Sequence, residues 1–259
     1  MNKLTRIASA SALAFAAIAT IATPSAEAAQ AAPVKNVVMV HGFFADGSGW
    51  KGVADILTRD GYTVSVVQEP ETSLADDVKA TTRAIDALPG RSILVGHSYG
   101  GMVITEAGNN DKVAGLVYVA AYIPDAGENL KTLADRMAPA TKGIKTTGDG
   151  HIYFDPALFH ADFAADLPAA DARFMALSQV LPTLKTARAP VTQAAWKSKP
   201  SWAIVSKADR TVNPELERFM ATRAGSRIVE INGSHVAFIA HPEQVARVIE
   251  QAAAAAGNE

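Results

Sequence analysis

Short apolar runs alternate with segments of helical period along the chain from Val34 onward. Most of these runs are apolar at consecutive positions and rich in valine and isoleucine, which is typical of strands that are buried on both faces. The strands expected from this pattern are 37–40, 63–68, 92–95, 115–120, 202–206 and 227–231. Strands that alternate with helices predict an α/β fold, in which a mostly parallel central sheet carries helices on both faces.

The helices between these strands have recognisable starts. One segment has apolar residues at helical spacing, at Leu74, Val78, Ile85 and Leu88. Ser73 precedes it and Asp76 follows three positions later, a pattern that favours a capped helix start. Pro214 and Pro242 each stand where a first helical position is expected, so each predicts a helix after one of the last two strands.

The alternation stops between about residues 124 and 200. This stretch has a helical and loop-like pattern, with aromatic residues at Phe154, Phe159, Phe163 and Phe174. An insertion of this kind lies over one edge of a sheet. We therefore expect a small, mainly helical cap.

The N-terminal segment has the pattern of a secretory signal. Lys3 and Arg6 precede an apolar run over 7–21, and Pro24 and Ala26-Glu27-Ala28 follow it. This pattern predicts a cleaved signal over residues 1–28, a mature domain over 29–259, and export to the periplasm or the medium.

Two alternatives remain for this segment. Ala29-Gln30-Ala31 offers a second cleavage site. A retained membrane anchor is the other, but the apolar run is too short to span a bilayer comfortably and lacks a basic flank after it.

Composition narrows the possible partners. The chain has 259 residues, of which 49% are hydrophobic, and a formal net charge of -2. Its basic residues are scattered, which argues against a nucleic-acid or anionic-lipid surface, so we expect a small molecule as the partner. The absence of cysteine excludes disulfides and a lipid on an N-terminal cysteine. The oligomeric state stays open.

The stretch "VGHSYGG" (95–101) holds the first candidate for chemistry. It places Ser98 between Gly96 and Gly100, after a predicted strand and before a predicted helix. This is the pattern of a nucleophile elbow, in which a strained serine needs small neighbours. The alternative is an ordinary serine in a turn, and other residues must decide between the two.

A nucleophilic serine needs a base and an acid that orients the base. His235 directly follows the last predicted strand, where a loop at the carboxyl edge of the sheet brings it toward Ser98. Asp209 follows the strand before it, which places the three residues in the chain order Ser, Asp, His. Asp125 is the alternative acid, and Asp209 as a turn cap is the alternative role for that residue.

Negative charge on a substrate oxygen requires backbone donors. Tyr99 follows the proposed nucleophile, and the loop after the first strand holds Gly42 and Phe43. We expect the N–H groups of Phe43 and Tyr99 to form an oxyanion hole, with Gly42 allowing close backbone approach.

Four motifs together, "HGFFADGSGW", "VGHSYGG", "SKADRTVNPELERFM" and "NGSHVAFIAHPEQV", resemble those of the α/β-hydrolase superfamily. Within it, the chain is most similar to a small cap-bearing group that includes bacterial carboxylesterases, plant methyl-ester esterases and hydroxynitrile lyases. This resemblance implies the α/β-hydrolase fold with Ser98 as nucleophile, His235 as base, Asp209 as acid, and oxyanion donors at Phe43 and Tyr99.

The resemblance also limits the reaction. The lyases of the group have a lysine just after the histidine, where this chain has Val236, and related epoxide hydrolases and dehalogenases have aspartate where Ser98 stands. It therefore implies a serine carboxylesterase that acts on a small-molecule ester through an acyl-enzyme, without metal or organic cofactor. Lactone, amide or perhydrolysis chemistry on the same triad, or a ligand-binding protein with little turnover, are the alternatives.

Substrate specificity is expected to lie in the cap, since a fixed triad leaves pocket shape as the variable. We expect an apolar or aromatic ester to contact Phe44, Phe154, Phe159 and Phe163, although cap aromatics also serve simply to pack the cap. A metal site among His151, Asp155, His160 and Asp162 is the weaker interpretation of those residues, because their spacing fits no tight ligand set. Trp50 and Trp202 are expected in the core.

Overall fold

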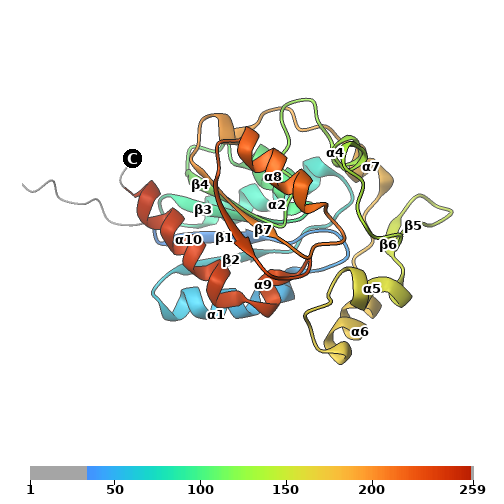
Figure 1. Ribbon diagram of the computed structural model, residues 1–259. Coiled ribbons are helices and arrows are strands. Elements are labelled where there is room, and N and C mark those ends of the chain that lie inside the picture. The colour runs from blue at the N-terminus through green and yellow to red at the C-terminus, as the bar shows by residue number, and fades with distance from the viewer. Residues whose placement is uncertain (1–33, 258–259) are drawn as a thin grey trace, which may run out of the picture. The chain divides into compact units, whose positions relative to one another are not determined.

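The computed structural model describes residues 34–257 (Figure 1). The predicted signal segment, residues 1–28, lies outside the described residues. Within the described range, no helix combines the length and the apolar character needed to cross a membrane.

A six-stranded parallel sheet forms the centre of this unit, in the order β2-β1-β3-β4-β7-β8. Its strands are β1 (Asn36–Val40), β2 (Thr63–Val67), β3 (Ser92–His97), β4 (Val113–Val119), β7 (Ser201–Ser206) and β8 (Arg227–Ile231). The four central strands are buried along their whole length, whereas the two edge strands β2 and β8 are partly exposed. All strands predicted from the sequence are confirmed.

The ends of the strands differ from the prediction by small amounts. β3 continues beyond Val95 because Gly96 and His97 still pair with Tyr118 and Val119 of β4. The apolar run stops earlier, so the run by itself predicts a shorter strand. This extension brings β3 directly up to Ser98.

Helices cover both faces of the sheet, as predicted. They are the 3-10 helix η1 (Gly47–Trp50), α1 (Lys51–Arg59), α2 (Leu74–Ala87), α3 (Gly100–Ala107), α8 (Pro214–Arg223), α9 (Ala237–Ala240) and α10 (Pro242–Ala256). α1 and α10 pack together on one face, and α2 and α3 on the other (Figure 1). Ser73 caps α2 by accepting from the Asp76 N–H, and Pro214 and Pro242 open α8 and α10 as predicted. Trp50 and Trp202 are buried in the core.

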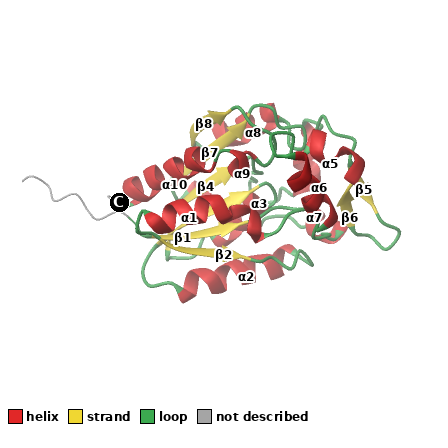
Figure 2. Cartoon of the chain, turned by 90° about the horizontal axis from the view of Figure 1, so that it is seen from below, coloured by secondary structure: helices red, strands yellow, loops and turns green. Residues whose placement is uncertain are grey.

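The segment between β4 and β7 contains α4 (Leu130–Arg136), β5 (Ile144–Thr146), β6 (Ile152–Phe154), α5 (Pro156–Asp162), α6 (Ala169–Leu177), α7 (Leu184–Arg188) and the 3-10 helix η2 (Ala195–Lys197). Both views place α5, α6 and the two short strands at one end of the sheet (Figures 1 and 2). Contacts such as Thr211 Oγ1 to the Asp162 carbonyl (2.9 Å) tie this cap to loops at the carboxyl ends of the strands.

The cap differs from the prediction in one element. β5 and β6 pair as an antiparallel hairpin, whereas the sequence predicts a mainly helical insertion. The two strands are too short to give a clear alternating pattern in the sequence. The glycine at position 150 is a signal of the turn between them, because its φ of +88° is a conformation that favours glycine. The hairpin carries Ile144 and Ile152 toward the site described next.

Candidate active site

Ser98 occupies a sharp, strained turn between β3 and α3. Its φ is +54°, a left-handed conformation that costs energy for a residue with a side chain. The neighbouring backbone leaves no space for larger residues: a Cβ on Gly96 would lie 2.6 Å from the Gly100 carbonyl oxygen, and one on Gly101 only 2.1 Å from that of Tyr122. The strained serine and its small neighbours have the geometry of a nucleophile elbow.

His235 connects Ser98 to Asp209 in one continuous hydrogen-bonded chain. The Ser98 Oγ lies 2.9 Å from His235 Nε2, and His235 Nδ1 lies 2.6 Å from Asp209 Oδ2. The other carboxylate oxygen of Asp209 accepts from the N–H groups of Thr211 (2.7 Å) and Val212 (2.9 Å). Asp209 is therefore oriented as an acceptor, so Nδ1 donates to it and Nε2 is left to accept from the serine hydroxyl.

The alternative acid, Asp125, lies elsewhere. Its carboxylate pairs with Lys197 (2.5 Å) and accepts from the Ala126 N–H (2.7 Å). The nearby lysine and these hydrogen bonds hold the pKa of Asp125 below its ordinary value. The structure therefore joins Asp209, and not Asp125, to His235.

The residues expected to supply the oxyanion hole lie close to Ser98: Tyr99 follows it in the chain, and Phe43 lines the same cavity. The backbone N–H groups of Phe43 and Tyr99 donate to no other atom among residues 34–257. Their rings stack on one another, with centroids 4.1 Å apart and an interplanar angle of 21°. Two unpaired donors are thus carried by two residues that contact each other.

The loop before Phe43 passes close to the nucleophile at Gly42. A Cβ there would lie 2.5 Å from the Ser98 Cβ and 2.8 Å from the His97 carbonyl oxygen. We expect Gly42→Ala to lower kcat/KM for an ester substrate by roughly 10²-fold, because displacement of reacting groups by a fraction of a bond length is costly. Gly148→Ala is the matched control, since a Cβ there meets nothing within 4 Å. Similar activities for the two variants would contradict this reading.

Two residues that the sequence did not indicate hold His235 in place. The buried His97 ring donates from Nε2 to the His235 carbonyl oxygen (3.0 Å), and the two rings lie 4.6 Å apart. Burial, together with the neighbouring His235, places the pKa of His97 well below its ordinary value, so its ring is neutral. Asp166 of the cap accepts from the Ser234 N–H (2.8 Å), which anchors the histidine loop from the other side.

A second buried carboxyl lies behind the triad. Glu217 of α8 is 2% exposed, accepts from the Ser206 N–H (3.2 Å) and faces Asp209. Burial, and then the charge of Asp209, raise the pKa of Glu217 well above its ordinary value of 4.5. Glu217 Oε1 has no hydrogen-bond partner among residues 34–257, and Asp209 keeps a lone pair that its three donors leave unused, so a protonated Glu217 can donate to it.

This raised pKa predicts a specific dependence of stability on pH. The unfolded chain loses the Glu217 proton near its ordinary pKa while the folded protein keeps it, so wild-type stability falls as pH rises from that value toward the folded pKa. Glu217→Gln removes this loss. We expect the difference in Tm, variant minus wild type, to be larger at pH 8 than at pH 5 by at least about 2 °C. Scanning calorimetry of both proteins across this pH range measures it. Glu215→Gln, exposed on the same helix, should show no such change.

An apolar cavity of about 60 Å³ opens beside Ser98. Its wall includes Phe43, Phe44, Tyr122, Leu130, Ile144 and Ile152. A larger cavity of about 400 Å³ shares the last four of these residues, so it continues the first one under the cap. Together they offer space for a group of substantial size next to the serine hydroxyl.

The aromatic residues expected to contact the substrate divide into two groups. Phe44 lines the cavity, as expected. Phe154, Phe159 and Phe163 do not: they are fully buried and pack edge-on or tilted against one another, with centroids 4.6 to 5.5 Å apart. None of the three lines this cavity, and Phe163 also packs edge-on against the His235 ring, with centroids 4.9 Å apart, so their contact with a substrate stays a prediction. Phe174 is largely exposed.

The four residues considered as metal ligands are not brought together. Asp162 pairs with Arg210 (2.6 Å), His151 lies 3.3 Å from Asp149, Asp155 caps α5, and the His160 ring bonds the Leu167 carbonyl (3.0 Å). Each therefore has a separate structural partner.

Comparison with known proteins agrees with this geometry. The model of the alpha/beta hydrolase family matches residues 37–248. The chain belongs to this family. A carbendazim hydrolyzing esterase of a Nocardioides species is 32% identical over 131 residues, which are 45% of this chain and 54% of that protein. The chain thus spans about half the length of that relative.

Two further proteins match this chain over nearly their full length. The rice esterase PIR7B is 25% identical over 261 residues, covering 83% of this chain and 94% of the esterase. A solved pyrethroid hydrolase from Sphingobium faniae superposes with a TM-score of 0.73 at 20% identity, covering 85% of this chain and 97% of the other, which shows the shared fold. The curated relatives support an ester-hydrolysing role for this hydrolase.

Proposed function

We propose that this hydrolase is a serine carboxylesterase that cleaves small to medium apolar or aromatic esters through an acyl-enzyme. The observation that carries the proposal is the hydrogen-bonded chain from Ser98 through His235 to Asp209, which ends at an apolar cavity. A buried triad that is complete and ordered for proton transfer serves nucleophilic catalysis, whereas ligand binding alone does not require it.

The reaction proceeds in two halves. The Ser98 Oγ attacks the ester carbonyl carbon while His235 Nε2 takes the hydroxyl proton, and the N–H groups of Phe43 and Tyr99 bind the oxyanion. Collapse expels the alcohol, which receives the proton from His235. Water then loses a proton to His235 and attacks the acyl carbon, which releases the carboxylic acid and restores the Ser98 hydroxyl.

The substrate class follows from the walls of the cavity. Phe44, Leu130 and Ile152 offer apolar contact, and the larger cavity beyond them accepts a group bulkier than acetyl. Relatives named as a carbendazim hydrolyzing esterase and a pyrethroid hydrolase support a small-molecule substrate. Since the triad needs no electrophilic assistance, the proposed mechanism uses neither metal nor organic cofactor.

The test combines turnover with covalent labelling of the wild-type protein. We expect hydrolysis of p-nitrophenyl esters, with kcat/KM rising from acetate to a medium chain and then falling when the cavity is filled. A fluorophosphonate should add one adduct by intact mass. Trypsin releases residues 92–112 as one peptide with two serines, Ser92 and Ser98, and fragmentation should place the adduct on Ser98.

Other results would redirect the proposal. Neither turnover nor adduct would refute the esterase and leave a ligand-binding protein of the same fold. An adduct on Ser98 with hydrolysis of lactones or amides, but not of linear esters, would keep the nucleophile and change the substrate class.

A further inference from the structure

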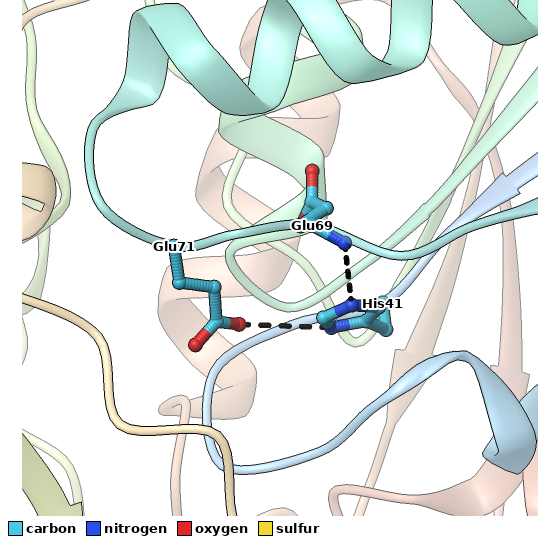
Figure 3. A group of neighbouring side chains, drawn as sticks. All are labelled: His41, Glu69 and Glu71. Carbon is cyan, nitrogen blue, oxygen red and sulfur yellow. Dashed lines mark hydrogen bonds and ion pairs between the residues drawn. The ribbon is translucent and has the colours of Figure 1, made fainter.

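A group of buried acidic side chains lies directly behind the loop that carries Phe43. The segment between β2 and α2 supplies Glu69 and Glu71, which are 5% and 0% exposed. Figure 3 shows the Glu71 side chain pointing at His41, which stands at the end of β1, and the Glu69 backbone on the other side of the same ring. Burial raises the pKa of both glutamates well above the ordinary value, which favours their neutral forms.

Hydrogen bonds, rather than a metal ion, organise this group. Ligand atoms of His41, Glu69 and Glu71 lie within 4.8 Å of one another, which is close enough for shared coordination. However, His41 Nε2 accepts from the Glu69 N–H (3.0 Å), so the proton is on Nδ1, which faces the Gly42 carbonyl (3.2 Å) and Glu71 (3.6 Å). Neither nitrogen of His41 therefore has a free lone pair for a metal ion. Without His41, which is the imidazole of this group, only the two glutamate carboxyls remain as candidate ligands.

Asp77 links this group to Tyr99. Asp77 lies in the first turn of α2 and is fully buried. Its Oδ1 accepts from the Glu71 N–H (2.8 Å), at a residue whose φ of +53° is strained. Its Oδ2 accepts from the Tyr99 hydroxyl (2.6 Å). A short bond to a charged acceptor is about twice as strong as a neutral one, so it holds the Tyr99 side chain firmly.

The Tyr99 side chain in turn supports both oxyanion donors. Its own backbone N–H is one of them, and its ring stacks on Phe43, whose N–H is the other. The β2–α2 segment thus contacts the two donor residues indirectly, through the Tyr99 hydroxyl and the stacking of Tyr99 on Phe43. The bond from the Glu69 N–H to His41 also joins this segment to the start of the loop that carries Phe43.

We propose that Asp77 is a positioning residue for the oxyanion hole, acting through the Tyr99 hydroxyl and the Tyr99–Phe43 stack. This inference rests on the proposed function, because it concerns donors that act only when an ester or its analogue is attacked by Ser98. It assigns a role in the reaction to a residue of the β2–α2 segment that contacts neither the triad nor the cavity wall.

The contact also predicts a pH effect. Burial raises the pKa of Asp77 to about 6. The groups that face it are Glu69, Glu71, Asp76, Tyr99 and, through Glu71, His41. The charge of Asp77 is one of the causes that raise the pKa of Glu69 and Glu71, so Asp77 ionises before them as pH rises. Its carboxylate, and with it the strong bond to Tyr99, is present above about pH 6 and is lost as pH falls below that value.

The experiment uses Tyr99→Phe, which removes only the hydroxyl, Asp77→Asn, and the double variant. We expect each single variant to lower kcat for p-nitrophenyl butyrate roughly 10- to 100-fold with KM changed less than about twofold, because binding is intact and only the donors move. The double variant should lose no more than the worse single one, since both remove the same bond. Phosphonylation of Ser98 by a fluorophosphonate should slow in parallel. Asp76→Asn, exposed on the same helix, is the control and should match wild type.

Contrary outcomes are distinct. Wild-type kcat in Tyr99→Phe, a loss confined to KM, or additive losses in the double variant would each overturn the positioning role. If Asp77→Asn does not fold, as judged by near-ultraviolet circular dichroism, Tyr99→Phe still decides the question. The dependence of kcat on pH adds a readout. The fall in kcat that the wild type shows as pH drops through about 6 should be absent in Asp77→Asn. Failure of the esterase proposal would appear separately, as wild-type protein without turnover or adduct.

Discussion

Ser98→Ala is expected to abolish ester hydrolysis, lowering kcat/KM by at least about 10⁴-fold, because no other hydroxyl among residues 34–257 is bonded to the His235 imidazole. The variant retains its oxyanion donors and cavity, so it should still bind substrate, with little change in a dissociation constant measured for a product acid. It should also gain no fluorophosphonate adduct. Initial rates with p-nitrophenyl butyrate and intact-mass measurements check both expectations.

Ser92→Ala is the matched control for this experiment. Ser92 begins the same strand and is fully buried, and its hydroxyl has no hydrogen-bond partner among residues 34–257. Its replacement removes a serine from the same tryptic peptide without touching the triad. Turnover that survives in Ser98→Ala but falls in Ser92→Ala would refute the nucleophile assignment.

Asp209→Asn is expected to lower kcat by about 10⁴-fold with nearly unchanged structure. The asparagine Oδ1 can still accept from the Thr211 and Val212 N–H groups. Its amide nitrogen, however, presents a donor to His235 Nδ1, so the imidazole must carry its proton on Nε2. That tautomer cannot accept the Ser98 proton, and the pH dependence of the remaining activity should shift toward alkaline conditions, where hydroxide can act directly.

The same substitution at the alternative acid provides the control. Asp125→Asn breaks a surface pair with Lys197 and should leave kcat unchanged, because exposed ion pairs contribute little and His235 is not involved. Equal losses in the two variants, or a loss only at Asp125, would show that the acid has been assigned to the wrong residue.

The parallel sheet, its helices and the chain order of the three triad residues were predictable from the sequence. Strand and helix patterns are local: the apolar run before Gly96, the Ser73 cap and the Pro214 start each depend on residues within a few positions. The hydrogen-bonded grouping of Ser98, Asp209 and His235 was predictable because the carboxyl ends of parallel strands lie at one edge of the sheet, so the loops after β3, β7 and β8 share that edge.

Contacts between distant segments were decided by the tertiary structure alone. Ser234 and Asp166 are 68 positions apart, and Tyr99 and Asp77 are 22 apart, with no repeating pattern that connects them. The cap aromatics show the same limit, since composition predicts that Phe154 and Phe163 are apolar contacts but not whether they face a ligand or each other. Local sequence determines which elements form because the side-chain period, the caps and the turn residues that specify an element lie within a few positions of one another. Which buried side chains meet depends on how those elements pack, and only the folded chain determines that.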